Sequence, residues 1–140
     1  MSIPPEKASE VREWLHKSVE DIRAAELDLG AFPPLVEDSL FHCQQAVEKA
    51  LKGFLAFHDI QFRKTHDIDE LSSKCEELKP GLKSVLGPAR DLSVFAGGFR
   101  YPGGAEPPPV DEAKKMLEVA RSACEAVRSS FPSGILQDKP

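Results

Sequence analysis

The sequence predicts an all-α domain, an up-and-down helical bundle of about five helices in which four form the core and one is short. Apolar residues recur at steps of three and four over long stretches, and no stretch alternates apolar and polar residues as a half-buried strand would. Prolines and glycines fall between these stretches, where helices end. The 140 residues suit one domain, which we place at residues 1–131, followed by a flexible tail at 132–140.

The first two predicted helices carry the clearest apolar stripes. The first opens at Pro4-Pro5 and closes at Gly30, because proline fits the first turn of a helix and glycine the position after its end. The second runs from about Leu35 to His58, and apolar or small residues cover most of its circumference, which favours a central place in the bundle. Its stripe consists of Val36, Leu40, Cys43, Val47, Ala50, Leu51 and Phe54. Ala46 and Gly53 form a strip of small residues that another helix could approach closely.

Three further helices complete the predicted bundle. The third begins at about Asp67, where Asp67 and Glu70 suggest a capping box. The fourth covers roughly residues 82–95 and should break at Pro88. The last opens near Val110 and has an unbroken apolar seam. Six residues of the second and last helices are predicted to be buried: Val47, Leu51, Phe54, Leu117, Ala120 and Cys124.

Composition excludes several functional classes. The chain has 18 basic and 23 acidic residues, a formal charge of −5, which argues against broad attraction to nucleic acid or anionic membranes but allows a local basic pocket. No apolar run is long enough to cross a bilayer, and the N-terminus lacks a signal-peptide core. Three widely spaced cysteines are best explained as reduced thiols of a cytosolic protein. We therefore expect a cytoplasmic protein that does not associate with membranes.

Generic catalytic motifs are missing. The sequence has no phosphate-binding glycine loop, no His-Glu-x-x-His, no nucleophile elbow and no paired cysteines, and its four histidines are scattered. We accordingly expect neither a metal site nor a cofactor.

A polar cluster on the second helix is the first candidate site. Gln45, Glu48 and Lys52 fall together, about a third of a turn from the apolar stripe. Glu48 and Lys52 could be an ordinary i, i+4 ion pair on a solvated face. Phe41 and Leu55 flank the cluster, however, and favour a groove or an interface.

Two later segments carry groups suited to nucleotides. Thr65-His66-Asp67 could be a simple helix start, and Phe99-Arg100-Tyr101-Pro102 a loop anchored by aromatic residues. Arginine can present a planar fork to phosphate oxygens, tyrosine a stacking face and a hydroxyl, and histidine a titratable donor. These are the groups that a nucleotide or RNA pocket requires.

Taken together, these motifs resemble the HEPN family, the higher eukaryotes and prokaryotes nucleotide-binding domains. The resemblance spans about Lys7 to Val127. It rests on Trp14 and the acidic Val19-Glu20-Asp21-Ile22 of the first helix, on Lys64-Thr65-His66-Asp67-Ile68 and on Arg100-Tyr101-Pro102. Its most specific part is the stretch from Phe41 to Lys52, Phe-His-Cys-Gln-Gln-Ala-Val-Glu-Lys-Ala-Leu-Lys, combined with Thr-His-Asp downstream.

The resemblance implies a small helical bundle, usually a homodimer and often encoded beside a minimal nucleotidyltransferase in what look like toxin–antitoxin pairs. The strip at Ala46 and Gly53 agrees with such a dimer. On this basis we expect a nucleotide or a nucleotide-bearing partner to bind at Gln45, Glu48, Lys49, Lys52, His66, Arg100 and Tyr101. Lys49, Lys52 and Arg100 would contact phosphates. Tyr101 would stack or donate a hydrogen bond, and Glu48 would orient a lysine or a ribose hydroxyl.

Some branches of the family are metal-independent RNases with an arginine, four to six residues, and then a histidine. This chain departs from that motif, because no histidine follows Arg100 and only two residues separate Arg63 from His66. The Arg-Tyr-Pro branch implies binding more directly than catalysis. Two alternatives stay open: an endoribonuclease in which Arg100 stabilises the cleaved phosphate and His66 is the general acid or base, and a purely structural dimer.

Overall fold

The computed structural model describes residues 3–96, 102–103 and 106–135, and within these residues the chain is helical and contains no strand. The α-helices are α1 (Pro5–Gly30), α2 (Val36–Phe57), α3 (Ile68–Leu78), α4 (Lys83–Ala89) and α5 (Val110–Arg128). Two 3₁₀ segments, η1 (Pro80–Leu82) and η2 (Arg90–Ala96), flank α4. The prediction of an all-α bundle of five helices is confirmed.

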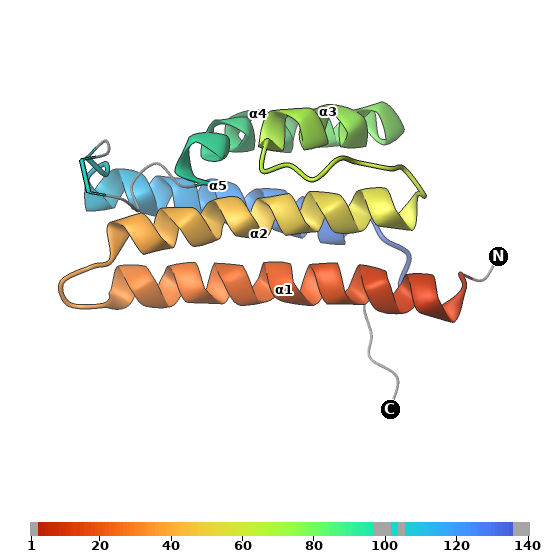
Figure 1. Ribbon diagram of the computed structural model, residues 1–140, viewed down its shortest axis with the longest axis horizontal. Coiled ribbons are helices and arrows are strands. Elements are labelled where there is room, and N and C mark those ends of the chain that lie inside the picture. The colour runs from red at the N-terminus through yellow and green to blue at the C-terminus, as the bar shows by residue number, and fades with distance from the viewer. Residues whose placement is uncertain (1–2, 97–101, 104–105, 136–140) are drawn as a thin grey trace.

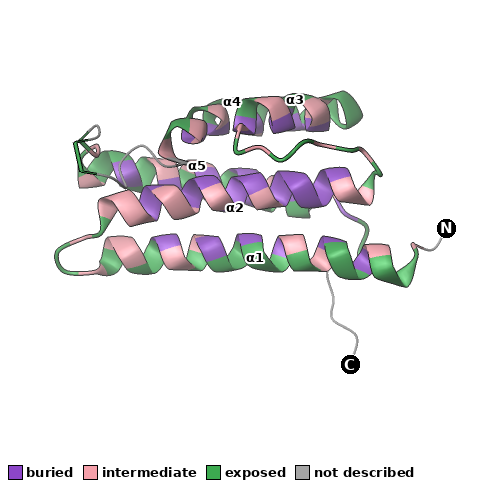
Figure 2. Ribbon diagram, in the orientation of Figure 1, coloured by how far each residue is buried: buried purple, intermediate pink, exposed green. Residues whose placement is uncertain are grey.

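Helix α2 occupies the middle of this bundle. Helices α1 and α2 lie side by side and antiparallel, while α3 and α4 form a short hairpin over the opposite side of α2, and α5 runs behind (Figure 1). Helix α2 contacts α1, α3, α5 and η2, and buried positions follow its whole length (Figure 2). The central place predicted from its apolar circumference is confirmed.

The core matches the apolar pattern closely. All six residues predicted to be buried are at most 6% exposed. The packed chain extends beyond α5, because Phe131 meets the Phe54 ring edge-on and Ile135 is 7% exposed. Residues 132–135 of the expected tail therefore belong to a turn that packs on the bundle, and residues 136–140 lie outside the described part of the chain.

The small residues of α2 are used within the chain. A Cβ atom added to Gly53 would lie 3.0 Å from Cβ of Trp14 and 3.3 Å from Cδ2 of Leu15, so α1 requires a glycine there. Nearby, the Ser18 hydroxyl donates to the Ala46 carbonyl at 2.7 Å. The close approach predicted from Ala46 and Gly53 is that of α1, and the strip does not offer a surface to a second copy.

Two helix boundaries show what local sequence does and does not decide. The break predicted at Pro88 is present: α4 ends at Ala89, the residue after Pro88, and the chain continues as the 3₁₀ segment η2 from Arg90. Asp67 caps α3 by accepting a hydrogen bond from the amide of Asp69 at 2.9 Å. The predicted capping box is wrong, because Thr65 Oγ1 accepts the Asp67 amide hydrogen and Glu70 pairs with Arg63 at 2.8 Å.

None of the described helices combines the length and the apolar character that a membrane span requires. Helix α1 is the longest at 26 residues, yet its outer face is largely charged.

Candidate functional site

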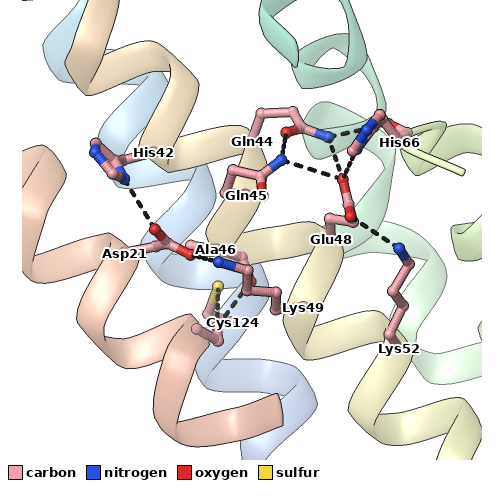
Figure 3. Close-up of polar contacts among 11 residues, drawn as sticks. Asp21, His42, Gln44, Gln45, Ala46, Glu48, Lys49, Lys52, His66 and Cys124 are labelled. Atoms are coloured by element: carbon pink, nitrogen blue, oxygen red, sulfur yellow. Dashed lines mark hydrogen bonds and ion pairs between the residues drawn. The ribbon is translucent and has the colours of Figure 1, made fainter.

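A buried carboxylate organises one flank of α2. Glu48 is 4% exposed, and its two oxygens together accept four hydrogen bonds (Figure 3). Oε1 receives Gln44 Nε2 at 2.9 Å, His66 Nδ1 at 2.9 Å and Gln45 Nε2 at 3.3 Å, while Oε2 receives Lys52 Nζ at 2.9 Å. We call these five residues the Glu48 cluster.

Helical spacing and one long connection bring the cluster together. Gln44, Glu48 and Lys52 are four residues apart, so their side chains follow one another along the same face of α2. His66 arrives on the segment between α2 and α3, and its backbone carbonyl accepts a hydrogen bond from Gln44 Nε2 at 3.0 Å. The side-chain oxygen Oε1 of Gln44 in turn accepts a hydrogen bond from Gln45 Nε2 at 2.7 Å. His66 is therefore fixed to α2 through both its backbone and its ring.

Glu48 carries a negative charge in this environment. Burial alone would raise the pKa of Glu48, but hydrogen bonds from Lys52, Gln44 and His66 outweigh burial and hold the pKa below its ordinary value. Because an ionised carboxylate only accepts hydrogen bonds, the proton in its contact with His66 lies on Nδ1. The carboxylate thus fixes the tautomer of the imidazole as well as its orientation.

The two basic groups of the cluster differ in exposure. The Lys52 side chain is 8% exposed, and its ammonium lies 5.8 Å from the ring centres of both Trp14 and Phe62, so it is the enclosed counter-ion of Glu48. The His66 side chain is 68% exposed. Since Nδ1 points to the buried carboxylate, the exposed edge of the ring is the one that carries Nε2.

A second carboxylate lies on the other flank of α2. Asp21 of α1 is 8% exposed and accepts Lys49 Nζ at 2.6 Å and His42 Nδ1 at 2.8 Å (Figure 3). Both donors come from α2, so this contact joins the two longest helices. The Lys49 ammonium is therefore paired with Asp21 on this flank, although Lys49 is adjacent to Glu48 in sequence.

The structure unites four of the seven predicted site residues. Gln45, Glu48, Lys52 and His66 share the Glu48 cluster, and Lys49 belongs to the neighbouring contact with Asp21. Within the cluster, Glu48 accepts a hydrogen bond from the ammonium of Lys52. Arg100 and Tyr101 lie outside the described residues.

Sequence reasoning missed Gln44, Asp21 and His42. A signal existed for Gln44, which falls inside the apolar stripe of α2 between Leu40 and Val47 and is fully buried. A polar residue within such a stripe requires a buried hydrogen-bonding partner. Asp21 sits in the same way on the inner face of α1, three residues after Ser18, and is also buried. Among the residues that the structure describes, no three His, Cys, Asp or Glu side chains are grouped as metal ligands.

Comparison with known proteins gives one match. The family model described as HEPN domain matches residues 11–130, which is most of the chain. Neither the search of curated proteins nor that of solved structures returned a match. The matched range includes both buried carboxylates and every predicted site residue.

Proposed function

Because the chain belongs to the HEPN domain family, we propose that it binds a nucleotide, with a phosphate of that nucleotide at His66. The observation that carries this proposal is the hydrogen bond between the buried Glu48 carboxylate and Nδ1 of the exposed His66 ring. Four donors around one carboxylate are more than a solvated i, i+4 ion pair needs. The hydrogen bonds to Glu48 and to Gln44 hold the His66 ring in one orientation, with the edge that carries Nε2 facing solvent.

The chemistry of that edge suits an anion. A protonated imidazole donates from both nitrogens, so Nδ1 can remain on Glu48 while Nε2 donates to a phosphate oxygen. Gln45 and Lys49 are partly exposed on α2, but the Gln45 amide already donates to Gln44 and Glu48, and Lys49 is paired with Asp21 on the other flank of the helix. Either side chain would therefore have to exchange a partner to donate to the phosphate. Lys52 has a different role, because its ammonium already neutralises Glu48 inside the fold. Arg100 as a phosphate ligand and Tyr101 as a stacking residue remain part of the proposal.

Calorimetric titration with adenosine 5′-monophosphate tests this function. Replacing one charge-assisted phosphate contact costs about 1.5–3 kcal/mol, so His66→Ala and Arg100→Ala should each weaken binding by about tenfold or more. The melting temperature of Arg100→Ala should stay close to that of the wild type. His66→Ala should also melt somewhat lower, because Glu48 loses one of its four donors, so its affinity is measured well below its melting temperature. His16→Ala is the matched control, because that side chain is 73% exposed on α1 and pairs with Glu20 on the same helix. Unchanged affinity in the His66 variant would contradict the proposed site.

A second candidate function, metal-independent RNA cleavage, is favoured by the same hydrogen bond. A neutral imidazole that donates from Nδ1 to a carboxylate has its lone pair on Nε2, as a general base requires. The binding proposal predicts that unstructured RNA stays intact in the presence of a chelator. Cleavage under those conditions, lost in both His66→Ala and Arg100→Ala, would establish the nuclease instead.

On family grounds we further propose a cytoplasmic homodimer that works with a minimal nucleotidyltransferase in a toxin–antitoxin-like pair. Light scattering at micromolar concentration should then give about twice the 15.4 kDa mass of one chain. Because α1 fills the strip at Ala46 and Gly53, the dimer face must use another surface. A mass near that of one chain would argue against the dimer.

A further inference from the structure

Trp14, the single tryptophan of the sequence, is not fully enclosed in the core. Its Cβ packs against Gly53, but the residue as a whole is only partly buried. Phe62 meets the indole in an edge-on arrangement, with the ring centres 6.3 Å apart. The indole also borders a surface groove of about 340 Å³, whose other lining residues are Ser9, Glu10, Glu13 and Lys17. The indole of Trp14 thus forms part of the wall of this groove.

Trp14 is the lining residue that connects this groove to the proposed phosphate site, because Lys52 lies beside its indole. The Lys52 ammonium lies 5.8 Å from the centre of the indole and 2.9 Å from Glu48 Oε2. The other oxygen of Glu48 holds His66 at 2.9 Å. One lysine and one carboxylate, with side chains 8% and 5% exposed, therefore link Trp14 to the imidazole inside the fold. A ligand that contacts both Trp14 and His66 would lie outside this enclosed pair.

The charges at the Trp14 end and at the His66 end favour one orientation of such a ligand. Glu10 and Glu13 are exposed carboxylates at the Trp14 end and outnumber Lys17, the exposed cation in the lining of this groove, so the local charge disfavours a phosphate there. They can accept hydrogen bonds from the exocyclic amino groups of adenine, cytosine or guanine. The His66 end has the opposite preference, because a protonated imidazole attracts phosphate. The base would then lie at Trp14 and the phosphate at His66.

We propose that Trp14 is the base-stacking residue for a nucleotide whose phosphate binds at His66. This inference rests on the proposed function and adds a base subsite to it. Stacking of a base on an aromatic side chain is worth about 1–3 kcal/mol, or about 5- to 150-fold in affinity, and it tolerates any base because every base has a π face. Lys52, lying over the indole, helps to hold it in one orientation.

The lone tryptophan makes the subsite directly observable. Adenosine 5′-monophosphate should quench the tryptophan emission of the wild-type protein, with the same dissociation constant that calorimetry gives. Ribose 5-phosphate, which has the phosphate but lacks the base, should bind more weakly by about 5- to 150-fold and leave the emission unchanged. Trp14→Leu keeps an apolar side chain against Gly53 but removes the π face, and it should bring the affinity for adenosine 5′-monophosphate down to that for ribose 5-phosphate.

Failure of this inference can be told apart from failure of the proposed function. If adenosine 5′-monophosphate binds and depends on His66, yet the emission is unchanged and Trp14→Leu binds it as tightly as the wild type, the base subsite is wrong and the phosphate site stands. If neither ligand binds, the proposed function is wrong and the base subsite with it. If Trp14→Leu does not fold, the change in wild-type tryptophan emission on adding adenosine 5′-monophosphate, compared with ribose 5-phosphate, still tests the base subsite.

Discussion

At the scale of single residues, Glu48 and Lys52 form the most deeply buried of the described ion pairs, with side chains 5% and 8% exposed. Removing two charges from water is costly, and the pair is tolerated because further hydrogen bonds satisfy the carboxylate. Once the partner is lost, the remaining charge is buried without compensation. The stability of the fold therefore requires that Glu48 and Lys52 be kept, or replaced, together.

Glu48→Gln should lower the free energy of unfolding by about 3–5 kcal/mol, because it leaves the Lys52 ammonium buried without a counter-ion. The double variant Glu48→Gln with Lys52→Met should recover most of that loss. Denaturant unfolding followed by circular dichroism measures both. Asp59→Asn is the control: it breaks the Lys7–Asp59 contact, whose aspartate is 78% exposed, and should cost less than about 1 kcal/mol. A double variant as unstable as the single one would show that charge is not the cause.

The lowered pKa of Glu48 also predicts how stability depends on pH. The carboxylate binds protons more readily in the unfolded chain, at its ordinary value of 4.5, than in the folded one. Its stabilising contribution is thus fully present above that value and is lost as the pH falls through the lower, folded pKa. The stability difference between the wild type and Glu48→Gln should shrink over this acidic range. A difference that stays constant from pH 6 to pH 3 would contradict the assignment.

A helical wheel could predict only part of the candidate site, because it describes the faces of one helix and not the contacts between helices. The wheel places Gln45, Glu48 and Lys52 on one flank of α2, but it contains nothing about which residue of another helix meets that flank. Lys49 shows the consequence, because its partner Asp21 is 28 positions away in sequence. His66 entered the predicted site through the family resemblance, and no periodicity could have brought it to Glu48.

At the scale of elements, the contact between α1 and α2 depends on one glycine. Apolar periodicity predicted both helices and the place of α2 at the centre. It did not identify which helix would approach Gly53, since every helix of a bundle has an apolar face. Asp67 does cap α3, but the capping box with Glu70 was mispredicted, because Thr65, two residues before Asp67, takes the Asp67 amide hydrogen that Glu70 would need.

Gly53→Ala should destabilise the protein by up to about 2 kcal/mol. The new methyl group would lie 3.0 Å from Cβ of Trp14, and overpacking of about 1–3 kcal/mol outweighs the gain in helix propensity of about 1 kcal/mol. Gly30→Ala at the end of α1 is the matched control, because a Cβ there meets nothing within 4 Å. It should leave the free energy of unfolding unchanged or raise it by up to about 1 kcal/mol. Equal effects of the two substitutions would argue against the close helix contact.

At the scale of the whole molecule, three buried thiols report on the integrity of the bundle. Cys43, Cys75 and Cys124 lie on α2, α3 and α5 and form no disulfide. Burial raises the pKa of Cys43 and of Cys75 to about 12 and that of Cys124 to about 11. Thiolate, the reactive form, is therefore scarce at neutral pH.

Iodoacetamide at pH 8 should label the three cysteines slowly in the native protein and rapidly in denaturant. Because the thiols come from three different helices, their labelling rates should rise together at the unfolding transition. Mass spectrometry resolves the three sites. Fast labelling of one cysteine in the native state would reveal local opening of its helix.

The attachment of His66 to α2 through both ring and backbone has a consequence for proteolysis. Lys64 is exposed two residues before His66, so trypsin can recognise it. A protease must draw several residues on each side of the cut into an extended strand, and this requires His66 to release both Gln44 and Glu48. When such opening is fast, cleavage follows the population of the open form. The rate of cutting after Lys64 therefore reports the fraction of molecules in which His66 is released from α2, and a ligand that holds His66 would slow the cut.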